Sequence, residues 1–320
     1  MSPSAPRASS GAQPDRGLAR GARQGRAFLD PAVVARLSHL DVRARFVVEG
    51  FIAGMHRSPF HGFSVEFAEH RPYMPGDPLK NLDWKVWARS DRLLIKQYTE
   101  ETNLRGHLLL DLSGSMAFRS PRAAMSKLEY AQSLAAALAY LMLQQQDAVG
   151  AMLFADRPLS YLPARAVRSH LDEVLKALGA ARPQGRTRLG PALHALAERI
   201  RRRGLIVLLS DLMDSPSEVL LGLQHFRHRR HEVVVFHILD PDELDFPYTD
   251  TATFVDMESA ERLTTEPWEI AKRYRERLAA WSAQYARVCR ENRIDYVRLD
   301  TRTPFDQALL AYLEKRARLL

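Results

Sequence analysis

From Leu104 to the end of the chain, short apolar runs alternate with longer segments in which apolar residues recur at every third or fourth position. Apolar runs of this length predict strands that are buried on both faces of a sheet. The predicted strands are 107–111, 148–154, 205–211, 233–240 and 295–300. The predicted helices are 123–146, about 165–179, 190–203, 216–229, about 268–291 and one after Pro304. This alternation predicts an α/β fold with a doubly wound, mainly parallel sheet.

The region before this pattern has a different composition. Residues 51–103 are dense in aromatic residues, proline, glycine and charges, and they contain strand-like pieces but no long helical stripe. A short helix is predicted ahead of them, at about 31–47. We expect three parts: a tail over 1–26, a short helix plus a β-rich subdomain over 27–103, and the α/β domain over 104–320. Inside the last part, 241–267 is rich in Asp, Pro and Thr and predicts an excursion with one short strand at 251–256.

Positive charge is concentrated at the N-terminus. The chain has 46 Lys and Arg against 38 Asp and Glu, a formal charge of +8, and residues 1–26 hold five Arg and one Asp. This tail has almost no apolar area to offset its ordering entropy, so we expect it to be disordered. A basic arm could also bind nucleic acid, but it lacks aromatic residues for base stacking, and we rank that function last.

The cysteine count and the length of the apolar runs constrain where in the cell this protein is expected to work. A single cysteine, Cys289, excludes an internal disulfide and a thiolate zinc site, which favours a reduced, cytoplasmic protein. The longest apolar run, 134–143, is about half of the roughly 20 residues that span a bilayer. We therefore expect no membrane span and no secretory signal. Cys289 lies beside an apolar helical stripe, which predicts an inert, packed thiol.

Oxygen-bearing side chains follow two of the predicted strands. The first strand ends in the D-x-S-x-S sequence with Asp111, Ser113 and Ser115, and a later strand ends in Asp211. Thr187 lies in the loop before the helix at 190–203. In an open α/β sheet, ligands bind at the carboxyl ends of the strands, so these groups are expected to converge. Carboxylates, hydroxyls and retained water suit Mg²⁺, or another hard cation such as Mn²⁺ or Ca²⁺.

Two other interpretations of these residues stay open. In the first, Asp111 and Ser113 cap the helix that begins near 122, and Asp211 caps the helix near 216. In the second, the site is that of a magnesium-dependent hydrolase acting on a phosphate ester. A haloacid-dehalogenase-like phosphatase needs a second aspartate where Ser113 stands, and the P-loop, dinucleotide and serine-hydrolase motifs are absent. No His or Glu has an assignable position beside the cluster as a general base, which favours a protein without catalytic activity.

The stretch from Leu104 to about Asp240 resembles a von Willebrand factor type A domain. That resemblance implies a metal-ion-dependent adhesion site made by Asp111, Ser113, Ser115, Thr187 and Asp211. Upstream, residues 56–104 resemble the bacterial family known as domain of unknown function fifty-eight. The matching motifs are E-F-x-E-x-R-x-Y from Glu66 to Tyr73, Pro75-Gly76-Asp77, Leu82-Asp83-Trp84 and Ala88-Arg89.

The family resemblance implies an adaptor for a MoxR-type AAA+ ATPase, in a chaperone-like system that assembles or matures other proteins. In such a site two aspartates offset the charge of the cation, and a Glu or Asp of the partner fills its open position. Charged residues of the upstream motifs form either a partner surface or an internal ion-pair network. These residues are Glu66, Glu69, Arg71, Asp77, Asp83, Lys85 and Arg89.

Overall fold

A six-stranded sheet forms the centre of the computed structural model, which describes residues 30–55, 70–72, 94–96 and 104–319. The strand order is β10-β7-β6-β3-β4-β5. Every neighbouring pair is parallel except β4 and β5. The strands are β3 Arg105–Asp111, β4 Ala148–Phe154, β5 Pro158–Arg165, β6 Leu205–Ser210, β7 Glu232–Leu239 and β10 Asp295–Asp300. The predicted α/β fold with a doubly wound, mainly parallel sheet is confirmed.

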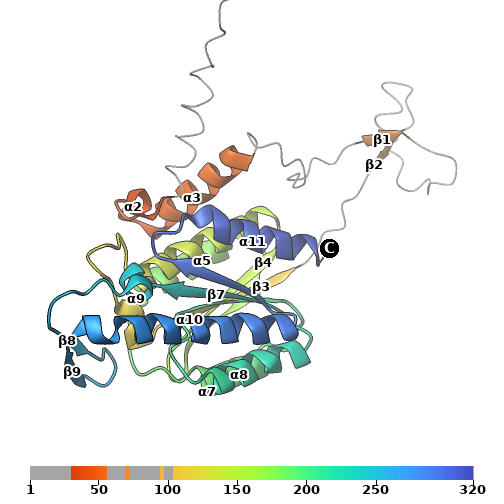
Figure 1. Cartoon of the computed structure of the whole chain (residues 1–320). Helices are drawn as coiled ribbons and strands as arrows, with labels where there is room; N and C mark the ends of the chain where they lie inside the picture. The colour runs from red at the N-terminus through yellow and green to blue at the C-terminus, as the bar shows by residue number, and fades with distance from the viewer. Residues whose placement is uncertain (1–29, 56–69, 73–93, 97–103, 320) are drawn as a thin grey trace, which may run out of the picture.

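Helices cover both faces of the sheet (Figure 1). One face packs against α5 Lys127–Gln144, α6 Arg168–Ala180 and α11 Phe305–Ala317. The other face packs against α7 Leu189–Arg199, α8 Pro216–His228 and α10 Pro267–Glu291. Because side chains alternate along a strand, Leu108 and Leu110 of β3 enter the first core and Leu109 enters the second.

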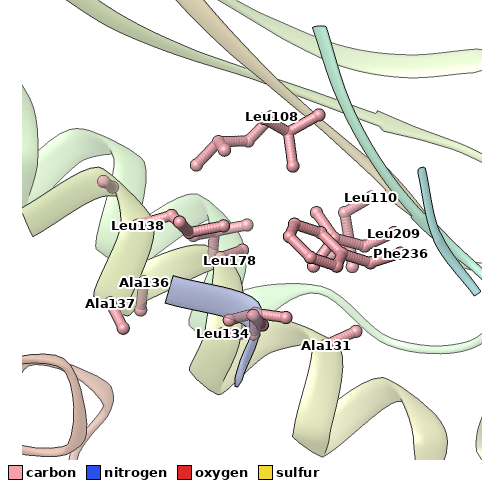
Figure 2. Close-up of a cluster of buried hydrophobic side chains, with 14 of the residues drawn as sticks. Leu108, Leu110, Ala131, Leu134, Ala136, Ala137, Leu138, Leu178, Leu209 and Phe236 are labelled. Atoms are coloured by element: carbon pink, nitrogen blue, oxygen red, sulfur yellow. The ribbon is translucent and has the colours of Figure 1, made fainter. Parts of the chain in front are cut away.

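Helix α5 is buried on nearly all sides. Leu134 and Leu138 of this helix face Leu110 and Phe236 of the sheet (Figure 2). Each large apolar side chain buried in this way contributes roughly 1.5–3 kcal/mol to stability. The helix begins four residues later than predicted because Ser126 and Glu129 form a capping box that defines its first turn.

Strand β5 was not among the predicted strands. Its sequence, PLSYLPAR, contains two prolines, which argue against a strand in the middle of a sheet. The structure places it at the edge, where missing N–H donors are tolerated, and it pairs with β4 through an irregular register. The helix predicted from 165 therefore begins at Arg168, after this strand ends.

The predicted N-terminal helix is two helices, α2 Pro31–Val34 and α3 Leu40–Met55. Val47, Val48 and Phe51 of α3 belong to the same core as α5, so this helix packs on the α/β domain. Strand β1 His70–Pro72 pairs with β2 Leu94–Lys96 in antiparallel fashion. The basic tail and most of the β-rich region lie outside the described residues, and the three-part division of the chain stays a prediction.

The excursion between β7 and α10 has its own structure. It contains α9 Pro241–Asp245 and a hairpin of β8 Ala252–Val255 and β9 Arg262–Thr265. The strand predicted at 251–256 is confirmed, whereas its partner β9 was not predicted. Phe246 stacks on Phe254 of the hairpin and on Tyr274 of α10, which ties the excursion to the domain.

Two predictions about apolar content can be checked on the described residues. None of the helices in the described ranges has the length and apolar character needed to span a membrane. Cys289 is buried in the second core, and burial raises the pKa of its thiol to about 12. A thiol held in this neutral form is a packing group, as predicted.

Candidate functional site

Two aspartates lie side by side at the carboxyl edge of the sheet. Asp111 is the last residue of β3, and Asp211 directly follows β6, the strand that pairs with β3 in parallel. Both side chains are completely buried. Parallel neighbours end at the same edge of a sheet, which explains why residues 100 positions apart in the chain meet here.

The carboxylate of Asp111 accepts hydrogen bonds from neutral donors. The backbone N–H of Ser113 donates to Oδ1 at 2.8 Å, and the hydroxyl of Ser210 donates to Oδ2 at 2.6 Å. Among the described residues, no Lys or Arg forms an ion pair with it. Burial, followed by the charge of Asp211, raises the pKa of Asp111 to about 7. Asp111 is therefore a buried acid whose charge the described part of the chain does not balance.

The D-x-S-x-S loop folds as a short 3-10 turn, Gly114–Ala117, directly after β3. The hydroxyl oxygens of Ser113 and Ser115 lie 3.1 Å apart. Backbone hydrogen bonds join this loop to the one that carries Thr187: Gln184 N–H donates to Leu112 O at 2.7 Å and Gly114 N–H to Gly185 O at 3.3 Å. The three hydroxyl residues predicted for the site are thus held on two adjacent loops.

Asp211 has a charged partner that Asp111 lacks. The ammonium of Lys127, in the first turn of α5, donates to Asp211 Oδ2 at 2.7 Å and to Glu243 Oε1 at 2.6 Å. The side chains of Lys127 and Asp211 are both 0% exposed. Burial acts to lower the pKa of Lys127, but the two carboxylates outweigh it and raise the pKa. Burial likewise acts to raise the pKa of Asp211, and the charge of Lys127 overcomes this and lowers it.

Thr187 is joined to the first loop by a glutamate of the excursion. Glu258 accepts a hydrogen bond from Thr187 N–H at 2.7 Å and another from the Thr187 hydroxyl. Ser115 N–H also points to this carboxylate, at 3.5 Å. The expectation that no Glu lies beside the cluster is therefore wrong. The excursion folds back over the strand ends, which a pattern of local periodicity does not predict.

The capping interpretation of the two aspartates is also wrong. Helix α5 is capped by Ser126, and the N-cap of α8 is Ser215. Asp111 instead accepts hydrogen bonds from Ser113 N–H in its own loop and from the hydroxyl of Ser210, the residue before Asp211. Asp211 accepts one from Met213 N–H in its own loop. The structure brings Asp111, Ser113, Ser115 and Asp211 together, and Glu258 links Thr187 to them. Their role as metal ligands stays a prediction.

The second predicted group cannot be placed. Arg71 is in β1, and its side chain is outside what the structure describes. The other charged residues of the upstream motifs lie outside the described residues altogether: Glu66, Glu69, Asp77, Asp83, Lys85 and Arg89. Their role as a partner surface or as an ion-pair network stays open.

The donors at the strand ends match a hard cation in chemistry. They are oxygens, and neighbouring ligands around an octahedral Mg²⁺ are about 2.9 Å apart, close to the 3.1 Å between Ser113 Oγ and Ser115 Oγ. In the described ranges, no three His, Cys, Asp or Glu side chains gather in a way that could hold a metal ion. A cation here would therefore depend on hydroxyls and water. The expected charge balance also changes, because Lys127 already offsets Asp211.

Four residues of the site were missed from the sequence. Ser210 precedes Asp211 in the strand LIVLLSD, and Lys127 is a lone cation at the start of an apolar helix, so both left a local signal. Glu243 and Glu258 lie among other acidic residues of the excursion and left none.

The chain folds as an α/β domain, with a mainly parallel six-stranded sheet between two helix layers and the D-x-S-x-S loop at the end of the central strand β3. The chain belongs to the family described as protein of unknown function DUF58, whose profile matches residues 69–286. An uncharacterized protein of Mycobacterium tuberculosis is 30% identical over 234 residues, which cover 72% of each chain.

Two solved structures were also compared with this fold. The conserved hypothetical protein BatB from Bacteroides thetaiotaomicron is 18% identical, with a TM-score of 0.47 over 67% of this chain and 99% of that one. The VWA domain of SpRpn10 is 12% identical, with a TM-score of 0.38 over 65% of this chain and 94% of that one.

Proposed function

We propose that this protein is a non-catalytic, metal-dependent protein-interaction module, and that it acts as an adaptor for a MoxR-type AAA+ ATPase in the assembly or maturation of other proteins. The resemblance of the D-x-S-x-S stretch to a von Willebrand factor type A domain supports an interaction module. The family resemblance is the support for the ATPase partner. A cytoplasmic location is part of this proposal.

The observation that carries the proposal is the convergence of oxygen groups at the ends of β3 and β6. Asp111 is buried without a balancing cation in the described part of the chain, and the hydroxyls of Ser113 and Ser115 lie beside it. An unbalanced buried carboxylate is costly, and a bound cation removes that cost. This arrangement favours a site that takes its positive charge from outside the chain.

Each residue would have a distinct part in such a site. Asp111, Ser113 and Ser115 would hold Mg²⁺ directly, and Thr187 and Asp211 would hold it directly or through water. The bound cation would supply a Lewis acid with a position open to an acidic side chain of the partner. Lys127 keeps Asp211 charged and oriented whether or not a cation is present, because its ammonium is buried against it.

The test is cation binding followed by capture of a purified MoxR-type ATPase from the same organism. Isothermal titration should detect one Mg²⁺ or Mn²⁺ per chain, and EDTA should abolish capture of the ATPase. Asp111→Ala should lose both, whereas Asp250→Ala, which removes an exposed aspartate, should lose neither. Cation binding and capture that survive Asp111→Ala would overturn the proposal.

One observation favours a second function, a magnesium-dependent hydrolase. Glu258 and Glu243 both lie beside the cluster, so a carboxylate is available as a general base. Turnover of a phosphate ester such as p-nitrophenyl phosphate that requires Mg²⁺ and is lost in Asp111→Ala would establish it. Nucleic-acid binding through residues 1–26 would instead be lost on deletion of that segment and would weaken steeply with salt.

A further inference from the structure

The two loops of the candidate site already bind a carboxylate, that of Glu258 in the same chain. Glu258 lies between β8 and β9, and its carboxylate accepts from the N–H and hydroxyl of Thr187 and, at 3.5 Å, from the N–H of Ser115. These donors form a carboxylate-binding site beside the predicted metal ligands. An acidic side chain from a partner would be received by the same groups, so Glu258 occupies the place that a partner needs.

The turn that carries Glu258 is built to present it. Oδ1 of Asp256 accepts from Glu258 N–H at 2.7 Å and from Ser259 N–H at 2.8 Å. The backbone N–H of Asp256 donates to Glu261 O at 2.9 Å, and Asp256 O accepts from Ala260 N–H at 2.9 Å. Ala260 takes the left-handed conformation with φ of 60°, which closes the turn. The carboxylate is therefore held on a preformed tip rather than on a long flexible loop.

Gly114 of the D-x-S-x-S loop leaves room for this tip. A Cβ atom at this position would lie 3.0 Å from the carbonyl oxygen of Met257 and 3.2 Å from Cγ of Glu258. A contact of 3.0 Å is tighter than most Cβ contacts, so one of the two segments would have to give by a few tenths of an ångström. The D-x-S-x-S loop and the turn thus lie in close contact.

The hairpin itself is weakly attached. Within the described ranges, β8 and β9 pair with each other and not with the six-stranded sheet. Its side chains Val255 and Leu263 are 51% and 61% exposed. A two-stranded hairpin has little stability of its own, so it can leave the site at a modest cost. Phe254 of the hairpin packs against the rings of Phe246 and Tyr248.

We propose that Glu258 is an internal ligand of this carboxylate-binding site, and that a partner reaches the site by displacing the β8–β9 hairpin. The inference rests on the proposed function, because it concerns the same site. It also defines the partner's chemistry: a Glu or Asp side chain presented on a tight turn, like the group that it replaces. Displacement makes capture competitive, so loss of the internal ligand strengthens it.

Hydrogen exchange of the full-length protein tests the inference without a partner. In Glu258→Gln, the amides of 252–265 should exchange about tenfold faster, because charge-assisted hydrogen bonds are lost. Glu261→Gln is the matched control, since it removes the same charge from an exposed residue of the same turn. Gly114→Ala should reproduce the faster exchange by pushing the turn away from the other side.

The two proposals fail in different ways. If Glu258→Gln and Glu261→Gln exchange alike in this segment, the internal ligand is overturned even where the wild type binds Mg²⁺. If the wild type binds no Mg²⁺ while Glu258→Gln alone frees the hairpin, the metal-dependent function is overturned and the internal contact stands. Circular dichroism of each variant confirms that exchange is compared between folded chains.

Discussion

The ends of β3 and β6 place the same residue type in two different environments. Asp111 and Asp211 are equally buried and lie on neighbouring strands. Asp111 is held by a hydroxyl and a backbone N–H, whereas Asp211 is held by the buried ammonium of Lys127. One aspartate is therefore balanced by a cation within the described part of the chain and the other is not, which is why the proposed external cation is assigned to Asp111.

Removing the ammonium of Lys127 should cause the largest loss of stability, because it makes the surroundings of Asp211 like those of Asp111. In Lys127→Met, two carboxylates, Asp211 and Glu243, lose the cation between them. Breaking a buried ion pair from one side costs about 3–5 kcal/mol, so urea unfolding should show a loss of that size. Lys272→Met changes an exposed lysine of α10 and should cost little. A loss below about 1 kcal/mol in Lys127→Met would contradict this account of the pair.

A residue of β3 that lies outside the candidate site should make the stability of the protein depend on pH. His107, in the middle of this strand, is buried, and burial lowers its pKa to about 4. The unfolded chain therefore takes up a proton near pH 6.5 that the folded chain refuses, so stability falls as the pH drops from about 6.5 to about 4. The loss from this residue is about 3 kcal/mol across that window.

The measurement is the free energy of unfolding in urea between pH 7.5 and pH 4.5. His107→Leu should flatten the pH dependence, because leucine cannot take up the proton. His237, whose pKa burial also lowers to about 4, should keep part of the slope in this variant. Equal slopes in the two proteins would show that His107 does not contribute.

A cation should stabilise the wild type through Asp111. At a Mg²⁺ concentration one hundred times its Kd, binding raises the free energy of unfolding by about 2.7 kcal/mol. Asp111→Asn should lose this increment, while Asp250→Asn, a change at an exposed residue, should keep it. The readout is the midpoint of urea unfolding with and without Mg²⁺. An increment that persists in Asp111→Asn would place the cation elsewhere.

Removing a neutral hydrogen-bond donor of Asp111 should cause the smallest loss of stability. Ser210→Ala removes the hydroxyl that donates to Asp111 at 2.6 Å and accepts from Leu212 N–H at 2.9 Å. The expected loss is about 1–2 kcal/mol, the range for a buried hydrogen bond left unmade. The exposed Ser217→Ala serves as control, and a loss in Ser210→Ala as large as that in Lys127→Met would erase the contrast between the two aspartates.

Much of the fold could be predicted because it follows from local patterns. Strand β4 was predicted at its observed bounds, and β10 likewise, since a short apolar or alternating run between helices has few other solutions. The edge strand β5 could not be predicted, because its prolines are acceptable only at an edge and the position of a strand in the sheet is not a local property.

The candidate site divides in the same way. The D-x-S-x-S loop and Asp211 follow strands, so their position at the carboxyl edge of a parallel sheet was available from the sequence alone. Their partners were not: Lys127 and Asp211 are 84 residues apart, and Ser115 and Glu258 are 143 residues apart. Hydrophobic periodicity indicates which face of a local segment is buried. Which charge balances Asp211, and which carboxylate binds to Thr187, depends on how distant segments pack, and the tertiary structure alone decided both.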